Sequence, residues 1–192
     1  QNDAVNETWI CDAGRFSYKA INDNRVLSPQ VRHAGQLQQA SWPVALEQAL
    51  EAIRTHEGTA VGIVVAPQGT NEDNYLLARL ASDVLMTPHV VLYPGVPGDE
   101  DDFLIRADKN PNTRGSQDMG LPSPATAAQL TAMAQAIEQG TVKVLYAIGV
   151  NLVEAFGVEA VTRWSTQLDC LIVQTSNTLP GCEQAHVLLP SA

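Results

Sequence analysis

Apolar residues along this chain follow two different periods, which alternate from residue 40 onward. Continuous apolar runs rich in Val and Ile have the length of strands, and such runs are typical of parallel strands that helices cover on both faces. These runs are 60–66, 89–93, 142–148, 170–173 and 186–189. Between them, apolar residues recur at helical spacing. The helices predicted in this way are 41–57, 71–85, 124–137 and 158–164.

Strands that alternate with helices of roughly 10 to 15 residues predict an α/β fold. We expect three layers, with a mainly parallel, Rossmann-like sheet between two layers of helices, and right-handed βαβ units. Helix 71–85 is predicted to carry apolar residues on one side, namely Tyr75, Leu76, Leu80 and Val84.

Two segments lack this alternation. Residues 1–40 hold few apolar runs and are interpreted as an irregular N-terminal arm that precedes one α/β domain, 41–192. The stretch 94–124 is a long connection, which a compact domain seldom keeps unless it is functional or mobile. Its acidic run 99–102 is interpreted as a solvated loop, and 103–105 as a candidate short strand.

Composition narrows the classes of partner and compartment. Eleven Lys and Arg against 21 Asp and Glu give a net charge of −10, which argues against nucleic acid or an anionic membrane surface as a direct partner. With 45% apolar residues the chain can bury a core. No apolar run reaches about 18 residues, so no membrane insertion is expected, and no secretion signal opens the chain. The chain starts at Gln1 rather than Met, which suggests a piece of a longer protein.

Two turns after predicted strands are candidate binding positions. Gly69 and Thr70 follow the strand 60–66, and Gly149 and Asn151 follow 142–148. In open α/β sheets, ligands bind at the carboxyl ends of the strands. The first turn lacks the GxGxxG pattern that lets a pyrophosphate approach a helix, so turn and capping chemistry is the simpler interpretation of all four residues.

Other reactive patterns are missing from the sequence. The four histidines stand far apart, no HExxH or CxxC pair places metal ligands on one face, and there is no GxSxG nucleophile or Walker motif. The three cysteines, Cys11, Cys170 and Cys182, favour a reducing compartment such as the cytosol rather than a disulfide framework. Hydrolase and metalloenzyme chemistry therefore have no support.

Short words of sequence carry a more specific resemblance. In their order and spacing they resemble the molybdopterin oxidoreductase family and, within it, the large iron–sulfur subunits (the G type) of NADH:quinone oxidoreductase, complex I. The words are WICDAGRF (9–16), RVLSPQVR (25–32), ASW (40–42), ADKNPNTRG (107–115), YAIGVN (146–151) and EQAHVLLPSA (183–192).

The resemblance implies a role for Cys11. In the family this position supplies the last of four thiolates to a 4Fe-4S cluster, and its CxxCxxxC partners lie upstream, outside this chain. A cluster needs all its ligands together, so the intact protein is expected to hold one and this fragment none. The arm, 1–40, would then be the remnant of an iron–sulfur subdomain. The plainer interpretation of Cys11 is a partly buried cysteine.

Departures from the family pattern argue against a catalytic molybdenum site. Ala13 stands where catalytic members usually place Lys, Leu152 replaces Pro in the turn after Gly149, and Gln174 stands where an acidic residue is usual. The sequence therefore predicts a fragment of an electron-transfer subunit that supports electron flow from NADH to quinone. It would hold no molybdenum and no self-contained active site.

Two other hypotheses stay open. One is a fragment of a molybdenum or tungsten pterin enzyme such as a formate dehydrogenase, in which Gly69, Thr70, Gly149 and Asn151 would surround the pterin dinucleotide. The other is a non-enzymatic α/β binding module. For the main hypothesis, the resemblance implies other peripheral-arm subunits of complex I as partners, on the cytoplasmic side of the membrane, and the isolated fragment could form a homodimer.

Overall fold

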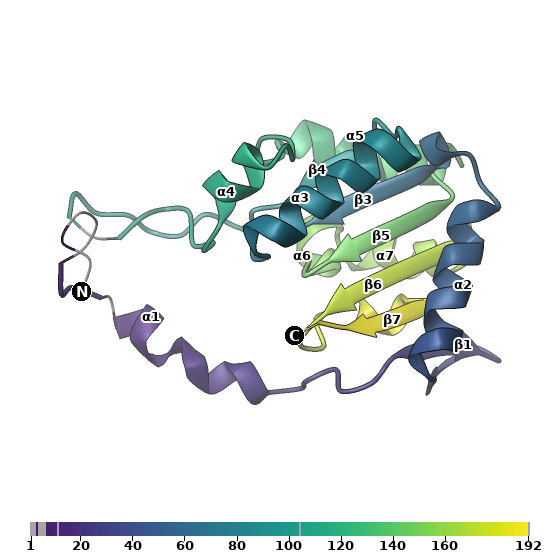
Figure 1. Cartoon of the computed structure of the whole chain (residues 1–192), viewed down its shortest axis with the longest axis horizontal. Coiled ribbons are helices and arrows are strands. Elements are labelled where there is room, and N and C mark those ends of the chain that lie inside the picture. Colours follow the sequence, from purple (N-terminus) through teal and green to yellow (C-terminus); the bar gives the residue numbers. More distant parts are fainter. Residues whose placement is uncertain (1–2, 4–6, 11, 104, 192) are drawn as a thin grey trace.

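The computed structural model describes residues 3, 7–10, 12–103 and 105–191 (Figure 1). Within these residues, seven strands form one sheet in the order β2-β1-β7-β6-β5-β3-β4. The strands are β1 (Gln30–His33), β2 (Gln36–Gln39), β3 (Val61–Val65), β4 (Val90–Leu92), β5 (Val144–Ile148), β6 (Cys170–Thr175) and β7 (Val187–Pro190).

The five strands from β3 to β7 run parallel, as the sequence predicts. All five residues of β3 are buried, and so are four of the first five residues of β6, because helices cover both faces of the sheet. Each of these five strands lies within or overlaps its predicted range, and the α/β class is confirmed.

Helices cover the sheet in two layers (Figure 1). One face packs against α5 (Ala127–Glu138), α6 (Leu152–Phe156) and α7 (Val158–Gln167), whose Trp164 is fully buried. The other face packs against α2 (Trp42–Arg54) and the π-helical segment η3 (Leu80–Leu85) that continues α3 (Asn71–Arg79). The predicted three-layer arrangement is therefore confirmed.

The side of α3 and η3 that faces the sheet differs from the apolar side noted in the sequence. Tyr75, Leu76 and Val84 are exposed, whereas Ala81 and Leu85 are buried. Two causes act together. Small residues at helical spacing form the true inner face, and the π-helical turns of η3 rotate the last residues relative to a continuous α-helix.

Part of the predicted arm belongs to the sheet. Strands β1 and β2 form a hairpin, and β1 pairs antiparallel with β7. The hairpin turn consists of Ala34 and Gly35, whose φ angles of 48° and 82° are those of a type I′ turn. This corrects the interpretation of residues 30–39 as irregular arm. The division of the chain into domains at residue 40 stays a prediction.

The remaining connections follow the predictions in part. Residues 12–22 of the arm form α1 (Asp12–Phe16) and the 3-10 helix η1 (Ser17–Asn22). In the long connection, the acidic run 99–102 is exposed as predicted. Phe103 and Ile105 are not in a strand, which contradicts the candidate strand there, and Leu104 lies outside the described residues. A helix that the sequence did not predict, α4 (Thr113–Asp118), lies in this connection, and a short 3-10 helix, η4 (Cys182–Gln184), precedes β7.

Candidate functional site

The two candidate turns lie side by side at the carboxyl edge of the sheet. Their strands, β3 and β5, are parallel neighbours, so the segments that follow them emerge together. The backbone N–H of Ala66 donates to the Ile148 carbonyl at 2.9 Å. A Cβ atom added to Gly149 would lie 3.7 Å from the Cβ atom of Ala66. The structure therefore brings Gly69, Thr70, Gly149 and Asn151 to one edge.

Thr70 and Asp73 close the start of α3 with a capping box. The Thr70 hydroxyl accepts from the Asp73 backbone N–H at 3.2 Å, and Asp73 Oδ2 accepts from the Thr70 backbone N–H at 3.0 Å. A helix N-terminus attracts anions because its first N–H groups are free and its dipole is positive there. Here the protein's own carboxylate already occupies that position.

The connection between β4 and α4 supplies a polar side chain to the same turn. Asn112 Nδ2 donates to the Gly69 carbonyl at 2.8 Å and to Asn71 Oδ1 at 3.0 Å. Its backbone N–H donates to the Pro67 carbonyl at 3.2 Å. Buried Asn74 adds a second amide donor to Gly69, at 3.3 Å. These contacts define an asparagine cluster of Asn71, Asn74 and Asn112 around Gly69.

The sequence did not predict this cluster. The word ADKNPNTRG, 107–115, was noted for its resemblance and not for a contact with the first turn. Close packing explains its glycine, because a Cβ atom added to Gly115 would lie 2.0 Å from Asn112 Oδ1 and 2.3 Å from Asn71 Oδ1. A spacing of about 40 residues between Asn71 and Asn112 offers no local signal for the contact.

The second turn is also satisfied by groups of the protein. Asn151 Oδ1 accepts from the Glu154 backbone N–H at 3.1 Å and so caps α6. Gly149, at a φ of 66°, donates its N–H to the Gln174 carbonyl at 2.8 Å. The Tyr93 hydroxyl donates to Glu154 Oε1 at 3.0 Å. Burial, followed by this hydrogen bond and the nearby charge of Glu154, raises the pKa of Tyr93 to about 12.

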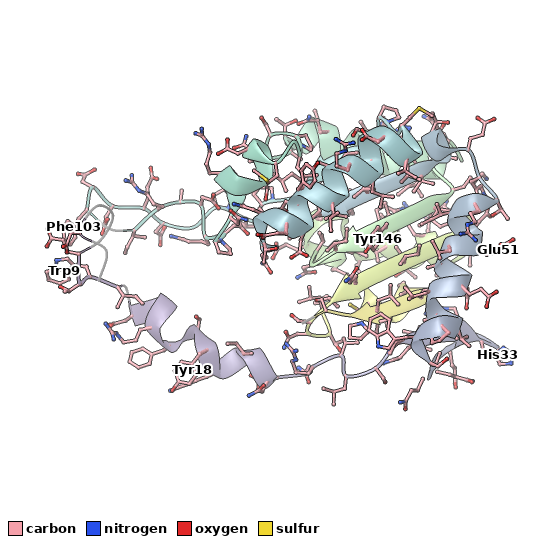
Figure 2. The ribbon with its side chains drawn as sticks, in the orientation of Figure 1. Trp9, Tyr18, His33, Glu51, Phe103 and Tyr146 are labelled. Carbon is pink, nitrogen blue, oxygen red and sulfur yellow. The ribbon has the colours of Figure 1, made fainter. Side chains whose placement is uncertain are left out.

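A neutral pair occupies the position where an acidic residue is usual in the family. The Tyr146 hydroxyl donates to Gln174 Oε1 across neighbouring strands β5 and β6. Figure 2 shows Tyr146 on the near face of the sheet, between α2 and α3. Burial raises the pKa of Tyr146 to about 12, so both partners are uncharged near neutral pH.

The described cysteines are structural. Cys170 packs with the core on one face of the sheet and Cys182 with the core on the other. Burial raises the pKa of both thiols, that of Cys170 to about 12, and a thiolate is the form that binds metal. Across the described ranges, no group of three or more His, Cys, Asp or Glu side chains could hold a metal ion. Cys11, the predicted cluster ligand, lies outside the described residues.

The arm crosses the same edge and is tied to the segment after β6. Asn177 Nδ2 donates to the carbonyls of Ile21 and Asp23, and the Val26 N–H donates to the Ser176 carbonyl. Farther out, the ring of Trp9 contacts that of Phe103 edge-to-face at 5.8 Å, where the arm meets the long connection (Figure 2). The arm therefore has a fixed attachment to the α/β domain at residues 21–26.

Loss of the Asn112 amide is expected to loosen the first turn. In Asn112→Ala, the Gly69 carbonyl and Asn71 Oδ1 each lose a donor, so the free energy of unfolding should fall by about 1 to 3 kcal/mol and amide exchange at 67–70 should quicken. Asn110→Ala in the same connection removes a hydrogen bond to Pro94 instead and serves as the control. Equal exchange at 67–70 in the two variants would contradict the assigned contact.

Taken together, the fold and this edge define an α/β domain whose turns bind one another rather than presenting reactive groups. No family model matches the chain. Over 86 residues, 45% of this chain and 11% of the relative, it is 41% identical to NADH-quinone oxidoreductase subunit 3 of Thermus thermophilus. Over 103 residues, 52% of this chain and 12% of the relative, it is 38% identical to the G subunit of the NADH-quinone oxidoreductase of Streptomyces coelicolor.

A second class of relative has a different name. Over 87 residues, 45% of this chain and 13% of the relative, the chain is 33% identical to the F420-dependent formate dehydrogenase 1 subunit alpha of Methanococcus maripaludis. The aligned parts thus span about a tenth of the length of these relatives. The resemblance to complex I subunits of the molybdopterin oxidoreductase type is confirmed. In the described part of the chain, no helix is long and apolar enough to cross a membrane.

Proposed function

We propose that this chain is part of the iron–sulfur electron-transfer subunit of an NADH-quinone oxidoreductase. In this role the α/β domain supports the path of electrons from NADH to quinone and performs no reaction of its own. Two relatives, named as the G subunit and as subunit 3 of NADH-quinone oxidoreductase, support the assignment. Its partners would be the other peripheral subunits of that complex, on the cytoplasmic side of the membrane.

The Asp73 carboxylate at the start of α3 is the observation that carries the scaffold role. A pyrophosphate placed at this helix would have to displace Asp73 Oδ2 from the Thr70 N–H, which it accepts at 3.0 Å, or lie beside it as a like charge. Both outcomes cost free energy. The capping box therefore favours a structural turn over a pterin dinucleotide site at Gly69 and Thr70.

The second turn supports the same conclusion. Its Gly149 N–H already donates to the Gln174 carbonyl, and Asn151 already caps α6. The side chain of Gln174 is neutral and accepts from Tyr146. A guanine base, by contrast, is well recognised by a carboxylate that accepts from its N–H groups.

The alternative function is a fragment of a pterin-dependent formate dehydrogenase. One observation favours it, namely the 33% identity to a formate dehydrogenase alpha subunit. In that case Gly69, Thr70, Gly149 and Asn151 would contact the pterin dinucleotide after rearrangement of the capping box.

The iron–sulfur cluster would belong to the intact protein rather than to this stretch. Cys170 and Cys182 do not fit a cluster, because they are buried on opposite faces of the sheet. Cys11 would be the one ligand that this chain contributes, alongside cysteines from upstream sequence. Without that upstream part, the arm could pair with a second copy of the fragment to form a homodimer.

Metal analysis of the protein, expressed with its native flanking sequence, tests this function. Iron without molybdenum or tungsten, together with the EPR spectrum of a reduced cluster, is the expected result. Cys11→Ser should remove or alter one cluster signal, whereas Cys182→Ser should leave the spectrum unchanged. Molybdenum or tungsten near one atom per chain would overturn the proposal in favour of the formate dehydrogenase alternative. Absence of both iron and molybdenum would overturn both.

A further inference from the structure

Several charged groups meet at the amino edge of the sheet, opposite the candidate site. His56 follows the end of α2, Asp169 precedes β6 and His186 precedes β7. Lys143 precedes β5 and accepts a backbone hydrogen bond from Asp169 at 2.9 Å. Arg32 reaches this edge from β1, with its Nε atom 2.9 Å from the Ala185 carbonyl.

Both ring nitrogens of His56 face acceptors. Nε2 lies 2.9 Å from Asp169 Oδ2, and Nδ1 lies 2.8 Å from the Ala52 carbonyl in the last turn of α2. A neutral imidazole has one N–H group and can satisfy one of these acceptors, whereas an imidazolium satisfies both. The end of a helix also favours a positive charge. The hydrogen bond to the Ala52 carbonyl is the largest cause that raises the pKa of His56; burial opposes it, and Asp169 adds to it.

His186 has the opposite requirement. Its Nδ1 accepts from the Leu171 backbone N–H at 2.9 Å, so this nitrogen must carry no proton. Its own backbone N–H donates to the Leu171 carbonyl, and its carbonyl accepts from the Arg32 N–H, each at 2.8 Å. The residue therefore links β1, β6 and β7. Burial, followed by the charge of Arg32, lowers the pKa of His186.

We propose that His56 and His186, together with Asp169, form a pH-sensitive latch that holds the amino edge closed while His56 is charged and His186 is neutral. Charged His56 ties the end of α2 to the start of β6. Neutral His186 ties β6 to β7 and β1. The latch lies at the edge of the sheet away from the candidate turns, so it is independent of the proposed function.

The two histidines bound the latch from opposite sides of the pH scale. His56 binds its proton more tightly in the folded chain, so its contribution is complete below about pH 6.5, the ordinary value, and is lost as the pH rises through its raised pKa. His186 binds its proton less tightly in the folded chain, so its penalty starts below about pH 6.5 and grows down to its lowered pKa. Lys143 opposes the charge on His56, Arg32 opposes a charge on His186, and Asp169 favours a charge on both.

Proton NMR of the whole 192-residue chain tests the latch through the titration of each imidazole. The midpoint of His56 should lie above that of His33, and the midpoint of His186 below it. His33 is exposed at the end of β1 and serves as the internal reference (Figure 2). Midpoints for His56 and His186 that coincide with that of His33 would overturn the proposal.

Stability against pH provides the second measurement. In His56→Gln, a neutral amide replaces the imidazolium, so the loss of stability above neutral pH should flatten relative to His33→Asn. In His186→Asn, an oxygen can take the place of Nδ1 as acceptor, so the loss below neutral pH should flatten. Unchanged limbs in both variants would overturn the proposal, and if either variant fails to fold the NMR midpoints of the unmodified chain decide.

Discussion

Gly58→Ala is expected to lower the free energy of unfolding by about 3 kcal/mol or more, at the upper end of the cost of overpacking. A Cβ atom on Gly58 would lie 1.7 Å from the carbonyl oxygen of Leu85 and 2.5 Å from its carbonyl carbon. These are main-chain atoms, so no side-chain rotation can relieve the overlap. Buried Leu85 anchors η3 to the sheet, and the connection from α2 to β3 would have to move away from it. Chemical denaturation with urea measures the loss.

Gly69→Ala is the matched control for this prediction. The nearest atom to its added Cβ would be the Asp73 Cβ, at 3.3 Å, and a shift of a few tenths of an ångström would accommodate it. The loss of stability should therefore stay below about 1 kcal/mol. A Gly58→Ala variant as stable as Gly69→Ala would mean that the end of η3 does not lie against residue 58.

Trp164→Ala is expected to cost about 3 to 5 kcal/mol, the range for removing a large aromatic residue from a core. Trp164 is fully buried on α7 and packs against Phe156 with ring centroids 4.9 Å apart. Its indole Nε1 is buried without a hydrogen-bond partner among the described residues. The side chain therefore stabilises the fold through its apolar area and not through its N–H group.

Trp164→Phe separates these two contributions. It keeps most of the aromatic contact with Phe156 and removes an N–H group that gains nothing from burial. Its cost should be less than half that of Trp164→Ala, and thermal denaturation of the two variants side by side measures the ratio. Equal losses would show that the indole N–H group has a partner that stabilises the fold.

The parallel strands were predictable because burial on both faces leaves a direct mark on the sequence. The run 60–66 contains β3, and 142–148 contains β5, since each position of such strands faces a helix layer or a neighbouring strand. The adjacency of the two candidate turns then follows from the fold class alone, because carboxyl ends of parallel strands share an edge.

The inner face of α3 and η3 was not predictable from apolar residues. Asn74, Leu77, Ala78, Ala81 and Leu85 lie at helical spacing and face the sheet or its flanking core. Alanine and asparagine are weak signals of burial, whereas the large residues on the outer side give a stronger but misleading pattern. The close approach of the helix to the sheet selects the small side chains.

The hairpin was missed because its two strands are mostly polar and short. Val31 and Leu37 are their only strongly apolar residues, and Ala34 stands where Asn or Asp usually marks a type I′ turn. The asparagine cluster was missed for another reason. A contact between Asn112 and the turn at Gly69 depends on how the long connection returns to the sheet, which no local pattern encodes.

The pairing of β1 with β7 also sets an order in which the chain can fold. Arg32 binds the Ala185 carbonyl across 153 positions of sequence. During synthesis, β1 emerges early but has its partner strand only after β7 has left the ribosome. Contacts of such separation slow folding. The nascent hairpin must therefore wait, with its edge unpaired, until nearly the whole domain has been made.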